Sequence, residues 1–447
     1  MIKQPRSDGN DELPATYRQV FGNTELSALF GSFALSKASS MLARVAITFL
    51  VFNATGSPFL AAAAFGLSYL PYLGPAQLLA TLADRLPYRT TMIIADLVRM
   101  VMIGLVAVPG MPLPVMLVLV FAAAMVEPAY QSSRSALMPK LVTGEVLTLA
   151  LSVHLTLNQT AQLAGYFLGG VIASINPRVA LLVNSAAYAV SALILVTWVR
   201  RRPAAVTDEP RKRILRETAE GFRLVFGDRV LRMIALVVFV TVTFTIVPEG
   251  AAAAWSHEVG GGAVLQGLIM ASAPVAAILA TIIFTRFMRP TLRQKLIKPL
   301  VLLAPLSLLP ALFQPPGWLV VGIAVVCNLT VASQSPLNAI FVQAVPDGYR
   351  ARAFSVMQSG LTLAQGFAVV VTGALAQTPL ATSQGIGVWA IAGVVAVGAL
   401  LVFWPSSQEF DAAVAAGTAP DRSTDRPDRE LPESASPGRP ASEPATG

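Results

Sequence analysis

The chain has 447 residues, of which 55% are hydrophobic and only 13% are charged, and its mean hydropathy is +0.65. Soluble globular proteins carry roughly 25% charged residues, so this chain has too little polar surface for a water-soluble fold. The net charge of +8 does not indicate nucleic-acid binding, because the tail after Trp404 is acidic on balance and the basic excess belongs to the hydrophobic part. The single cysteine, Cys327, excludes an internal disulfide and is interpreted as a small packing residue.

Twelve stretches of the chain are long and apolar enough to cross a bilayer as helices, which takes roughly 20 residues each. The predicted spans are 26–53, 57–82, 90–109, 113–135, 147–174 and 178–199 in the first half, and 231–253, 263–287, 296–314, 317–343, 352–377 and 384–404 in the second. Lys37 and Arg44 interrupt the first stretch, so the count needs support from the loops. The polar residues before it lack the features of a cleavable signal peptide, and none is expected.

Lys and Arg are distributed unequally between alternate loops. The loops after the odd-numbered spans are short and nearly free of them, and Arg178 is the one exception. The basic residues of the other loops are Arg85 and Arg89, Arg134 and Lys140, Arg200 to Arg232, Arg286 to Lys298, and Arg350 with Arg352. Because Lys and Arg are concentrated in cytoplasmic loops, we expect both termini to be cytoplasmic.

These boundaries divide the chain into five parts. We expect a cytoplasmic N-terminal tail, a six-helix half, a basic linker, a second six-helix half and a disordered C-terminal tail, which correspond to residues 1–25, 26–199, 200–230, 231–404 and 405–447. The linker alternates apolar and basic residues, which is typical of an amphipathic helix lying on an anionic inner leaflet. A plain solvated connector is the alternative.

The two halves share landmarks, as repeat-built transporters do. Matching segments before the fifth and eleventh spans are Glu127-Pro128 and Ser335-Pro336, Pro139-Lys140 and Pro346-Asp347, and Leu151-Ser152-Val153 and Phe354-Ser355-Val356. The sequence therefore predicts an all-α polytopic membrane protein with twelve transmembrane helices in two pseudo-symmetric six-helix halves.

The loop after the second span carries a family resemblance. Residues Ala80 to Arg89 read ATLADRLPYR, which resembles the major facilitator superfamily signature Gly-x-Leu-Ala-Asp-Arg-x-Gly-Arg-Lys at the same place between spans two and three. Further segments resemble bacterial drug and siderophore exporters, including the enterobactin-exporter-like group; they are 42–46, 55–57, 95–99, 135–139 and, for one actinobacterial branch, 247–250. The resemblance implies the major facilitator fold, a bacterial inner membrane and export of a small organic molecule.

The resemblance also implies a gate formed by Asp84, Arg85 and Arg89. Asp84 is expected near the N-terminal end of the eleventh helix, where its charge favours the helix dipole, so that the contact holds the cytoplasmic side shut. The sequence departs from the signature at Ala80, Pro87 and Tyr88. It also has Ser40 where the family pattern suggests an acidic residue one turn before Arg44, so Arg44 lacks its easiest intrahelical partner.

Charged residues at membrane depth are the first candidates for a mechanism, because each costs about 2.5–3.5 kcal/mol on insertion scales. We assign Lys37, Arg44, Asp96 and Arg99 to an intramembrane charge network, with Asp96 and Arg99 paired three residues apart. The proton-coupling candidates are Glu127 first, because Pro128 can kink its helix, and Glu249 second. Static ion pairing of Asp96 and Glu127, and interfacial exposure of Glu249, are the alternatives.

Polar side chains at helical spacing predict a substrate pathway. The fifth span presents His154, Asn158 and Gln162 on one face; the tenth and eleventh add Gln334, Asn338, Gln358 and Gln365. The resemblance implies that these helices border the central cavity. Interhelical hydrogen bonding is the alternative.

The sequence lacks the patterns of an enzyme. Its two histidines are far apart without a ligand cluster, so no metal site or cofactor is expected, and no Gly-rich phosphate loop is present. We expect a monomeric secondary transporter that exchanges protons for a small organic molecule by alternating access. The alternatives are an importer of a small metabolite, a membrane-embedded enzyme and a transport-inactive sensor.

Overall fold

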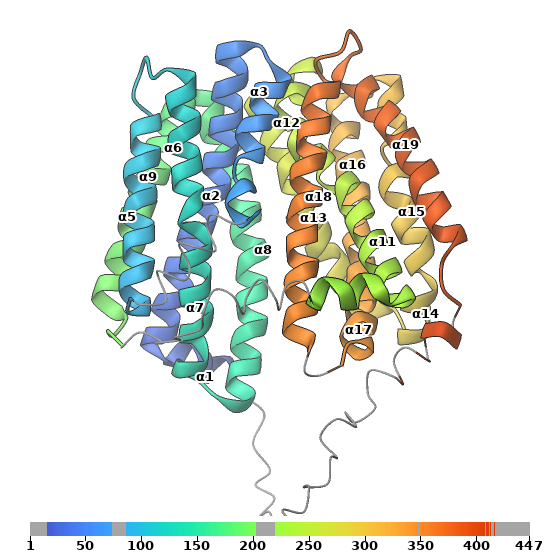
Figure 1. Cartoon of the computed structure of the whole chain (residues 1–447). Helices are drawn as coiled ribbons and strands as arrows, with labels where there is room; N and C mark the ends of the chain where they lie inside the picture. The colour runs from blue at the N-terminus through green and yellow to red at the C-terminus, as the bar shows by residue number, and fades with distance from the viewer. Residues whose placement is uncertain are drawn as a thin grey trace, which may run out of the picture.

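The computed structural model describes residues 16–73, 86–202, 220–346, 349–406, 408–410, 412 and 415. Within these ranges all regular secondary structure is helical. Figure 1 shows the helices in two groups that lie side by side. The N-terminal group comprises α2 to α9 and the C-terminal group α11 to α19, and α1, α14 and α17 lie near one end of the bundle, here named the α1 end.

The first group follows the short helix α1 (Tyr17–Gly22). Its elements are α2 (Thr24–Thr55), α3 (Pro58–Gly66), η1 (Leu70–Leu73), α5 (Tyr88–Val106), α6 (Leu113–Met125), α7 (Glu127–Leu141), α8 (Gly144–Ile175) and α9 (Pro177–Trp198). The elements of the second group are α11 (Arg229–Thr245), α12 (Val247–Glu258), α13 (Gly262–Phe287), α14 (Pro290–Lys295), α15 (Ile297–Leu306), η2 (Leu309–Phe313), α16 (Gly317–Asn328), η3 (Leu329–Ser333), α17 (Gln334–Ala344), α18 (Arg350–Leu375) and α19 (Thr382–Val402).

The predicted spans coincide with these helices where the structure describes them. Among the described residues, eight helical stretches are long and apolar enough to cross a membrane, and α15 with η2 forms a shorter apolar one. The remaining predicted spans are less apolar or are described only in part. Helix α5 contains Arg89, Asp96 and Arg99, and α8 has polar residues in its middle. The second predicted span continues into residues 74–85, which lie outside the described residues. The prediction of an all-α polytopic membrane protein is confirmed.

The predicted tails and linker lie largely outside the described residues. Helix α1 falls inside the expected N-terminal tail, of which 1–15 are not described, and α2 begins at Thr24. Of the linker, 203–219 are not described, while 220–227 are helical and lie across the lower part of the C-terminal group in Figure 1. Most of the C-terminal tail, 416–447, is also outside the described residues.

Side-chain caps define where several helices begin. The carboxamide oxygen of Asn23 accepts hydrogen bonds of 3.1 Å from two backbone N–H groups at the start of α2, and Asn176 and Asp228 cap α9 and α11 in the same way. These oxygens satisfy amide donors that have no partner inside the helix. Gly56 follows the last residue of α2 and caps the helix, and its φ of +63° favours glycine because glycine has no Cβ.

Several predicted spans are divided into shorter helices, and at two of these breaks a carboxylate follows a proline or precedes one. Helix α6 ends at Met125 and α7 begins at Glu127, followed by Pro128; α11 ends at Thr245 and α12 begins at Val247, with Pro248 before Glu249. Proline lacks the amide donor that would continue the ladder of hydrogen bonds, so each helix restarts there. Glu127 and Glu249 thus lie in first turns, where the helix dipole favours a negative charge.

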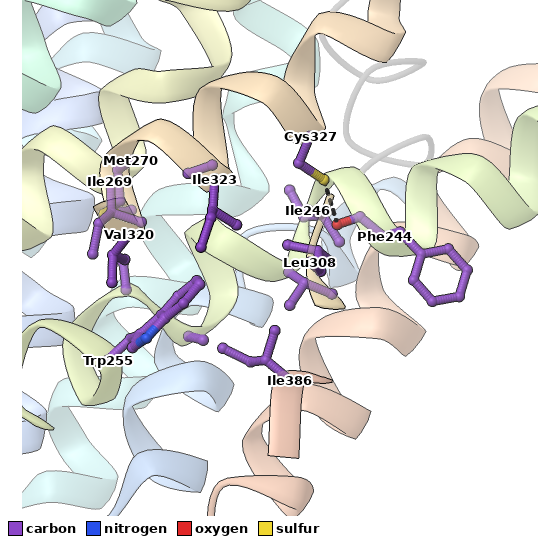
Figure 2. Packing of buried hydrophobic residues seen from close by; sticks show 14 of the residues in the cluster. Phe244, Ile246, Trp255, Ile269, Met270, Leu308, Val320, Ile323, Cys327 and Ile386 are labelled. Atoms are coloured by element: carbon purple, nitrogen blue, oxygen red, sulfur yellow. Dashed lines mark hydrogen bonds between the residues drawn. The ribbon is translucent and has the colours of Figure 1, made fainter. Parts of the chain in front are cut away.

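The C-terminal group has an apolar core around Trp255 on α12. Figure 2 shows Trp255 next to Val320, Ile323 and Ile386, and the indole is fully buried. Cys327, also fully buried, donates weakly to the carbonyl oxygens of two neighbouring helices, at 3.5 Å from Phe244 and 3.4 Å from Ala304. It packs as the small residue that its apolar sequence context suggested.

Glycines allow the two groups to approach closely away from the α1 end. A Cβ on Gly170 of α8 would lie 2.8 Å from the carbonyl oxygen of Ala263 on α13, and one on Gly267 would lie 2.7 Å from the carbonyl oxygen of Tyr166. Small residues let helix backbones pack directly in membranes. Side-chain hydrogen bonds also join the groups, among them one of 2.6 Å from Gln266 to the Thr48 hydroxyl and one of 2.8 Å from Gln377 to that of Ser57.

Candidate functional site: a charged cavity in the N-terminal group

A cavity of about 100 Å³ lies among α2, η1, α5, α6, α7 and α9. Its charged lining residues are Lys37, Arg44, Arg99 and Glu127, and its polar ones are Ser40, Ser68, Tyr72, Gln131 and Tyr188. Apolar atoms line the rest, from Met41, Ile47, Ile103, Val120 and three alanines. Three of the four members of the predicted charge network therefore surround one cavity together with Glu127, the first coupling candidate. The polar residues of the fifth predicted span do not line this cavity.

Arg99 is held between two carboxylates. Its Nη2 lies 3.1 Å from Glu127 Oε2, and its Nη1 lies 3.6 Å from Asp96 Oδ1. The predicted contact between Asp96 and Arg99 is present, and Glu127 is the closer partner. The guanidinium also lies 4.8 Å from the centre of the Tyr130 ring, close enough for a cation–π interaction.

The two carboxylates differ in their access to the cavity. The Asp96 side chain is fully buried and accepts hydrogen bonds from the hydroxyls of Ser36 at 3.2 Å and Ser191 at 2.6 Å. The side chain of Glu127 is 22% exposed, lines the cavity and accepts a hydrogen bond of 2.7 Å from Gln131. A water molecule or substrate in the cavity can therefore reach Glu127, whereas Asp96 is enclosed by protein.

Lys37 and Arg44 line the same cavity with weaker pairing. In the part of the chain that the structure describes, neither has a carboxylate within ion-pair distance. Arg44 lies 5.5 Å from the ring centre of Phe65 and 5.6 Å from that of Tyr69. These contacts are electrostatically favourable but do not neutralise the guanidinium charge.

Glu249 lies where the two groups meet. Its Oε2 accepts a hydrogen bond of 3.0 Å from the hydroxyl of Tyr166 on α8, and Tyr166 is almost fully buried. Its charge also interacts with those of Arg44 and Lys37, although both are beyond ion-pair distance. Glu249 is thus not an exposed interfacial residue, and it connects α12 of the C-terminal group to the charges of the N-terminal group.

The predicted polar stripe of α8 is divided between different partners. The ring of His154 packs against that of Phe33 at a tilt of 52°, with ring centres 4.4 Å apart, and Arg134 Nη1 lies 2.9 Å from its imidazole. Asn158 and Gln162 instead both donate to the side-chain oxygen of Gln159, at 3.0 and 3.2 Å. The predicted stripe therefore does not converge on one ligand position in this conformation.

A second cavity, of about 350 Å³, lies in the C-terminal group among α11, α17 and α18. Gln334, Asn338 and Gln358 line it together with Ser335 and apolar residues that include Phe341 and Phe354. Three of the predicted substrate residues are therefore brought together, and Gln365 is not among the lining residues.

The gate prediction can be followed only in part. Asp84 and Arg85 lie outside the described residues. Arg89, at the start of α5, donates a hydrogen bond of 2.5 Å to the carbonyl oxygen of Val196 on α9, so it holds two helices of the N-terminal group together. The role of these three residues stays a prediction.

Several residues of the site were missed by sequence reasoning. Tyr166, Gln131, Tyr72, Ser36 and Ser191 all contact the buried carboxylates or their partners. Each is a polar residue within a predicted span, a weak signal because many structural polar side chains share it. No group of metal-binding side chains occurs among the described residues.

The comparisons with known proteins decide the family. The sequence pattern of the Major Facilitator Superfamily matches residues 29–369. The chain belongs to the major facilitator superfamily. It is therefore a secondary active membrane transporter that spans the bilayer several times, and not an enzyme. No curated protein sequence matches the chain.

Solved major facilitator structures share this fold at low sequence identity. A POT family transporter in complex with 5-aminolevulinic acid is 14% identical, with a TM-score of 0.67 over 85% of this chain and 96% of that one. The peptide transporter PepTSo is 12% identical, with a TM-score of 0.66 over 89% and 99%. The nucleoside transporter NupG is 13% identical, with a TM-score of 0.65 over 86% and 100%. These likenesses concern the fold alone and do not distinguish the exporter-like group from other branches.

Proposed function

We propose that this transporter exports a small organic molecule in exchange for protons, by alternating access between its N-terminal and C-terminal groups. The proposal rests on the position and the contacts of Glu127. It lies at a helix break, lines the cavity, and shares Arg99 with the enclosed Asp96. A carboxylate that can meet water in one conformation and apolar neighbours in another can take up and release a proton.

Asp96 makes protonation of Glu127 structurally tolerable. When Glu127 takes a proton, its ion pair with Arg99 is lost, but Asp96 remains beside the guanidinium as a second negative partner. An uncompensated buried charge would be strongly destabilising. We therefore assign Asp96 a structural role and Glu127 a proton-carrying role.

Glu249 is the second coupling residue in this proposal. Its hydrogen bond with Tyr166 crosses between the groups, so a change in its charge alters a contact on which their relative position depends. Discontinuous helices with half-helix termini at a central site are a recurring feature of secondary transporters. The breaks before α7 and α12 fit that pattern.

The orientation and surroundings belong to the same proposal. We assign the α1 end and both termini to the cytoplasm of a bacterial cell, from the distribution of Lys and Arg. The basic linker lies on the anionic inner leaflet, and the protein acts as a monomer. The halves are 26–199 and 231–404, and the polar residues of α8, α17 and α18 bind the substrate.

Import of a small metabolite is the second candidate, and the direction of transport rests on the resemblance to exporters. A transport-inactive sensor is disfavoured, because a sensor has no need for an accessible carboxylate at a helix break. The solved neighbours include peptide and nucleoside transporters, so the test must cover several chemical classes.

Inverted membrane vesicles test the proposal. Respiration acidifies their interior, and acridine orange reports the pH gradient as fluorescence quenching. A compound that an exporter exchanges for protons should partly reverse the quenching when added outside. A proton-coupled importer should do so only when the compound is loaded inside. A panel of amines, carboxylates, nucleosides and peptides that has no effect in either arrangement, relative to vesicles without the protein, would contradict proton coupling.

A further inference from the structure

The charges around the cavity of the N-terminal group are unbalanced. Three cations, Lys37, Arg44 and Arg99, line it together with a single carboxylate, Glu127. The charge of Arg99 is matched by Glu127 and by Asp96 behind it. Two cations therefore face the space without a carboxylate at ion-pair distance among the described residues. This imbalance is unusual at membrane depth, where ionisable residues generally pair with one another.

Lys37 has no hydrogen-bonding partner among the described residues. Its ammonium group carries three donors, and the charges acting on it are those of Glu127 and Glu249, which attract it, and Arg44 and Arg134, which repel it. A lysine without a partner inside the bilayer costs about 2.5–3.5 kcal/mol on insertion scales. An anion in the cavity would offset part of that cost.

Arg44 lies on the same side of α2 as Lys37. The two residues are seven positions apart, which is close to two helical turns, and Ser40 lies between them on that face. An acidic residue at position 40 would neutralise Arg44 within the helix, but Ser40 instead shares a hydrogen bond of 2.8 Å with the Tyr188 hydroxyl. The rings of Phe65 and Tyr69 leave the fork of the Arg44 guanidinium unmatched by any carboxylate.

The size of the cavity fits one functional group. A volume of about 100 Å³ corresponds to roughly three water molecules at about 30 Å³ each. Such a space holds a carboxylate or a phosphate, while the remainder of a larger molecule must extend beyond it. The hydroxyls of Ser68 and Tyr72 line the wall as additional donors.

We infer that Lys37 and Arg44 bind an anionic group, a carboxylate or a phosphate, of the transported molecule. The inference rests on the proposed transport function and narrows it to organic anions. Lys37 supplies a point charge, and Arg44 supplies a planar fork that matches two oxygens of the anion. Arg99 remains paired with Glu127 and Asp96 and forms part of the wall of the site.

Binding of small aromatic probes to the purified protein tests this inference. Benzoate and phenyl phosphate carry the two candidate anionic groups, benzamide is the neutral match and benzylamine the cationic match. Calorimetric titration should show saturable binding of benzoate or phenyl phosphate and none of benzamide or benzylamine. The anion that binds more tightly identifies the anionic group of the transported molecule as a carboxylate or a phosphate. Absence of saturable anion binding, or equal binding of benzamide, would overturn the inference.

Three variants locate the site. Lys37→Gln and Arg44→Gln should each weaken binding of the preferred anion at least tenfold. Lys140→Gln removes a cation that instead donates to the Tyr88 hydroxyl at 2.9 Å and does not line the cavity, so it should leave the affinity unchanged. Equal affinity in wild type and in both cavity variants would place the anion elsewhere and reject the assignment.

A fourth variant covers the case in which removal of a cation prevents folding. Ser40→Asp adds a carboxylate on the same face of α2, so it should compete with the added anion, abolish its binding and leave the fold intact. Retained binding in Ser40→Asp would contradict the site. The proposed function has a separate readout. Proton exchange with neutral or cationic compounds, without anion binding, supports transport and rejects this site. Anion binding without proton exchange supports the site and rejects proton-coupled transport.

Discussion

The hydroxyl of Tyr166 on α8 donates a hydrogen bond of 3.0 Å to Glu249 on α12. This contact joins the two groups of helices beside the glycine packing of α8 on α13, where the carbonyl oxygen of Tyr166 faces Gly267. It is a hydrogen bond to a titratable carboxylate at an interface that opens in the proposed alternating access. Glu249 is therefore placed where its charge and the position of the groups depend on each other.

Replacement of Tyr166 measures the strength of this contact. Tyr166→Phe should lower the free energy of unfolding by about 1.5–3 kcal/mol, the range for hydrogen bonds to charged groups. Tyr130→Phe is the matched control, because the buried Tyr130 hydroxyl has no hydrogen-bond partner among the described residues. Thermal unfolding in detergent compares the two variants. Equal melting temperatures would show that the Tyr166 hydrogen bond contributes nothing.

A disulfide across the groups should stop transport reversibly. Gln377 donates to the Ser57 hydroxyl at 2.8 Å, so the double variant Ser57→Cys/Gln377→Cys, in a Cys327→Ser background, replaces both partners of a contact between the groups by thiols. Oxidation should cross-link them and abolish transport, and reduction should restore it. Each single variant under the same oxidant is the control. Full transport by the cross-linked protein would contradict separation of the groups at this end.

Asp96 is expected to act as a structural anion. Asp96→Asn removes a negative charge from beside Arg99 and keeps the shape of the side chain, so the protein should lose about 3 kcal/mol of stability, as expected for a broken buried pair. Glu127→Gln should cost less, because the partly exposed Glu127 can exchange its ion pair for contact with water. Melting temperatures in the reverse order would assign the structural role to Glu127.

Glycine packing gives a prediction with an internal control. Gly267→Ala places a Cβ 2.7 Å from the carbonyl oxygen of Tyr166, and overpacking of this kind costs about 1–3 kcal/mol. Gly322 on α16 has no atom within 4 Å of the equivalent Cβ, so Gly322→Ala should stabilise its helix by about 0.5–1 kcal/mol. If both variants unfold at the wild-type temperature, the contact between α8 and α13 is looser than described.

The sequence predicted what depends on local pattern. Apolar stretches and the Lys/Arg distribution gave the order of the spans, and the dipeptide Glu127-Pro128 marked a helix break that is present. The site depended on contacts between distant segments. Tyr166 and Glu249 are 83 residues apart, and no periodicity within either helix indicates that they meet. The same limit applies to Arg99, whose closer carboxylate is on another helix.

Polar spacing on one helix does not indicate which neighbours its side chains contact, and the substrate-binding role of these residues stays a prediction. His154, Asn158 and Gln162 share a helical period, but His154 contacts Arg134, whereas Asn158 and Gln162 both donate to Gln159. Neighbouring side chains can form hydrogen bonds with a polar residue in the absence of a ligand. Which neighbours do so depends on how the helices pack and not on the spacing of polar residues along one helix. The lack of a partner for Lys37 could likewise be recognised only after the surrounding helices were in place.

Proton coupling through Glu127 and Glu249 is the central claim, and vesicles reconstituted with Glu127→Gln test it most directly. The compound that wild-type vesicles transport best is followed in two modes, accumulation driven by an imposed pH gradient and counterflow without a gradient. Counterflow should persist in the variant, because glutamine keeps the shape of the side chain, while pH-driven accumulation should fall to the level of protein-free vesicles. Accumulation at the wild-type level by Glu127→Gln, and also by Glu249→Gln, would contradict the account.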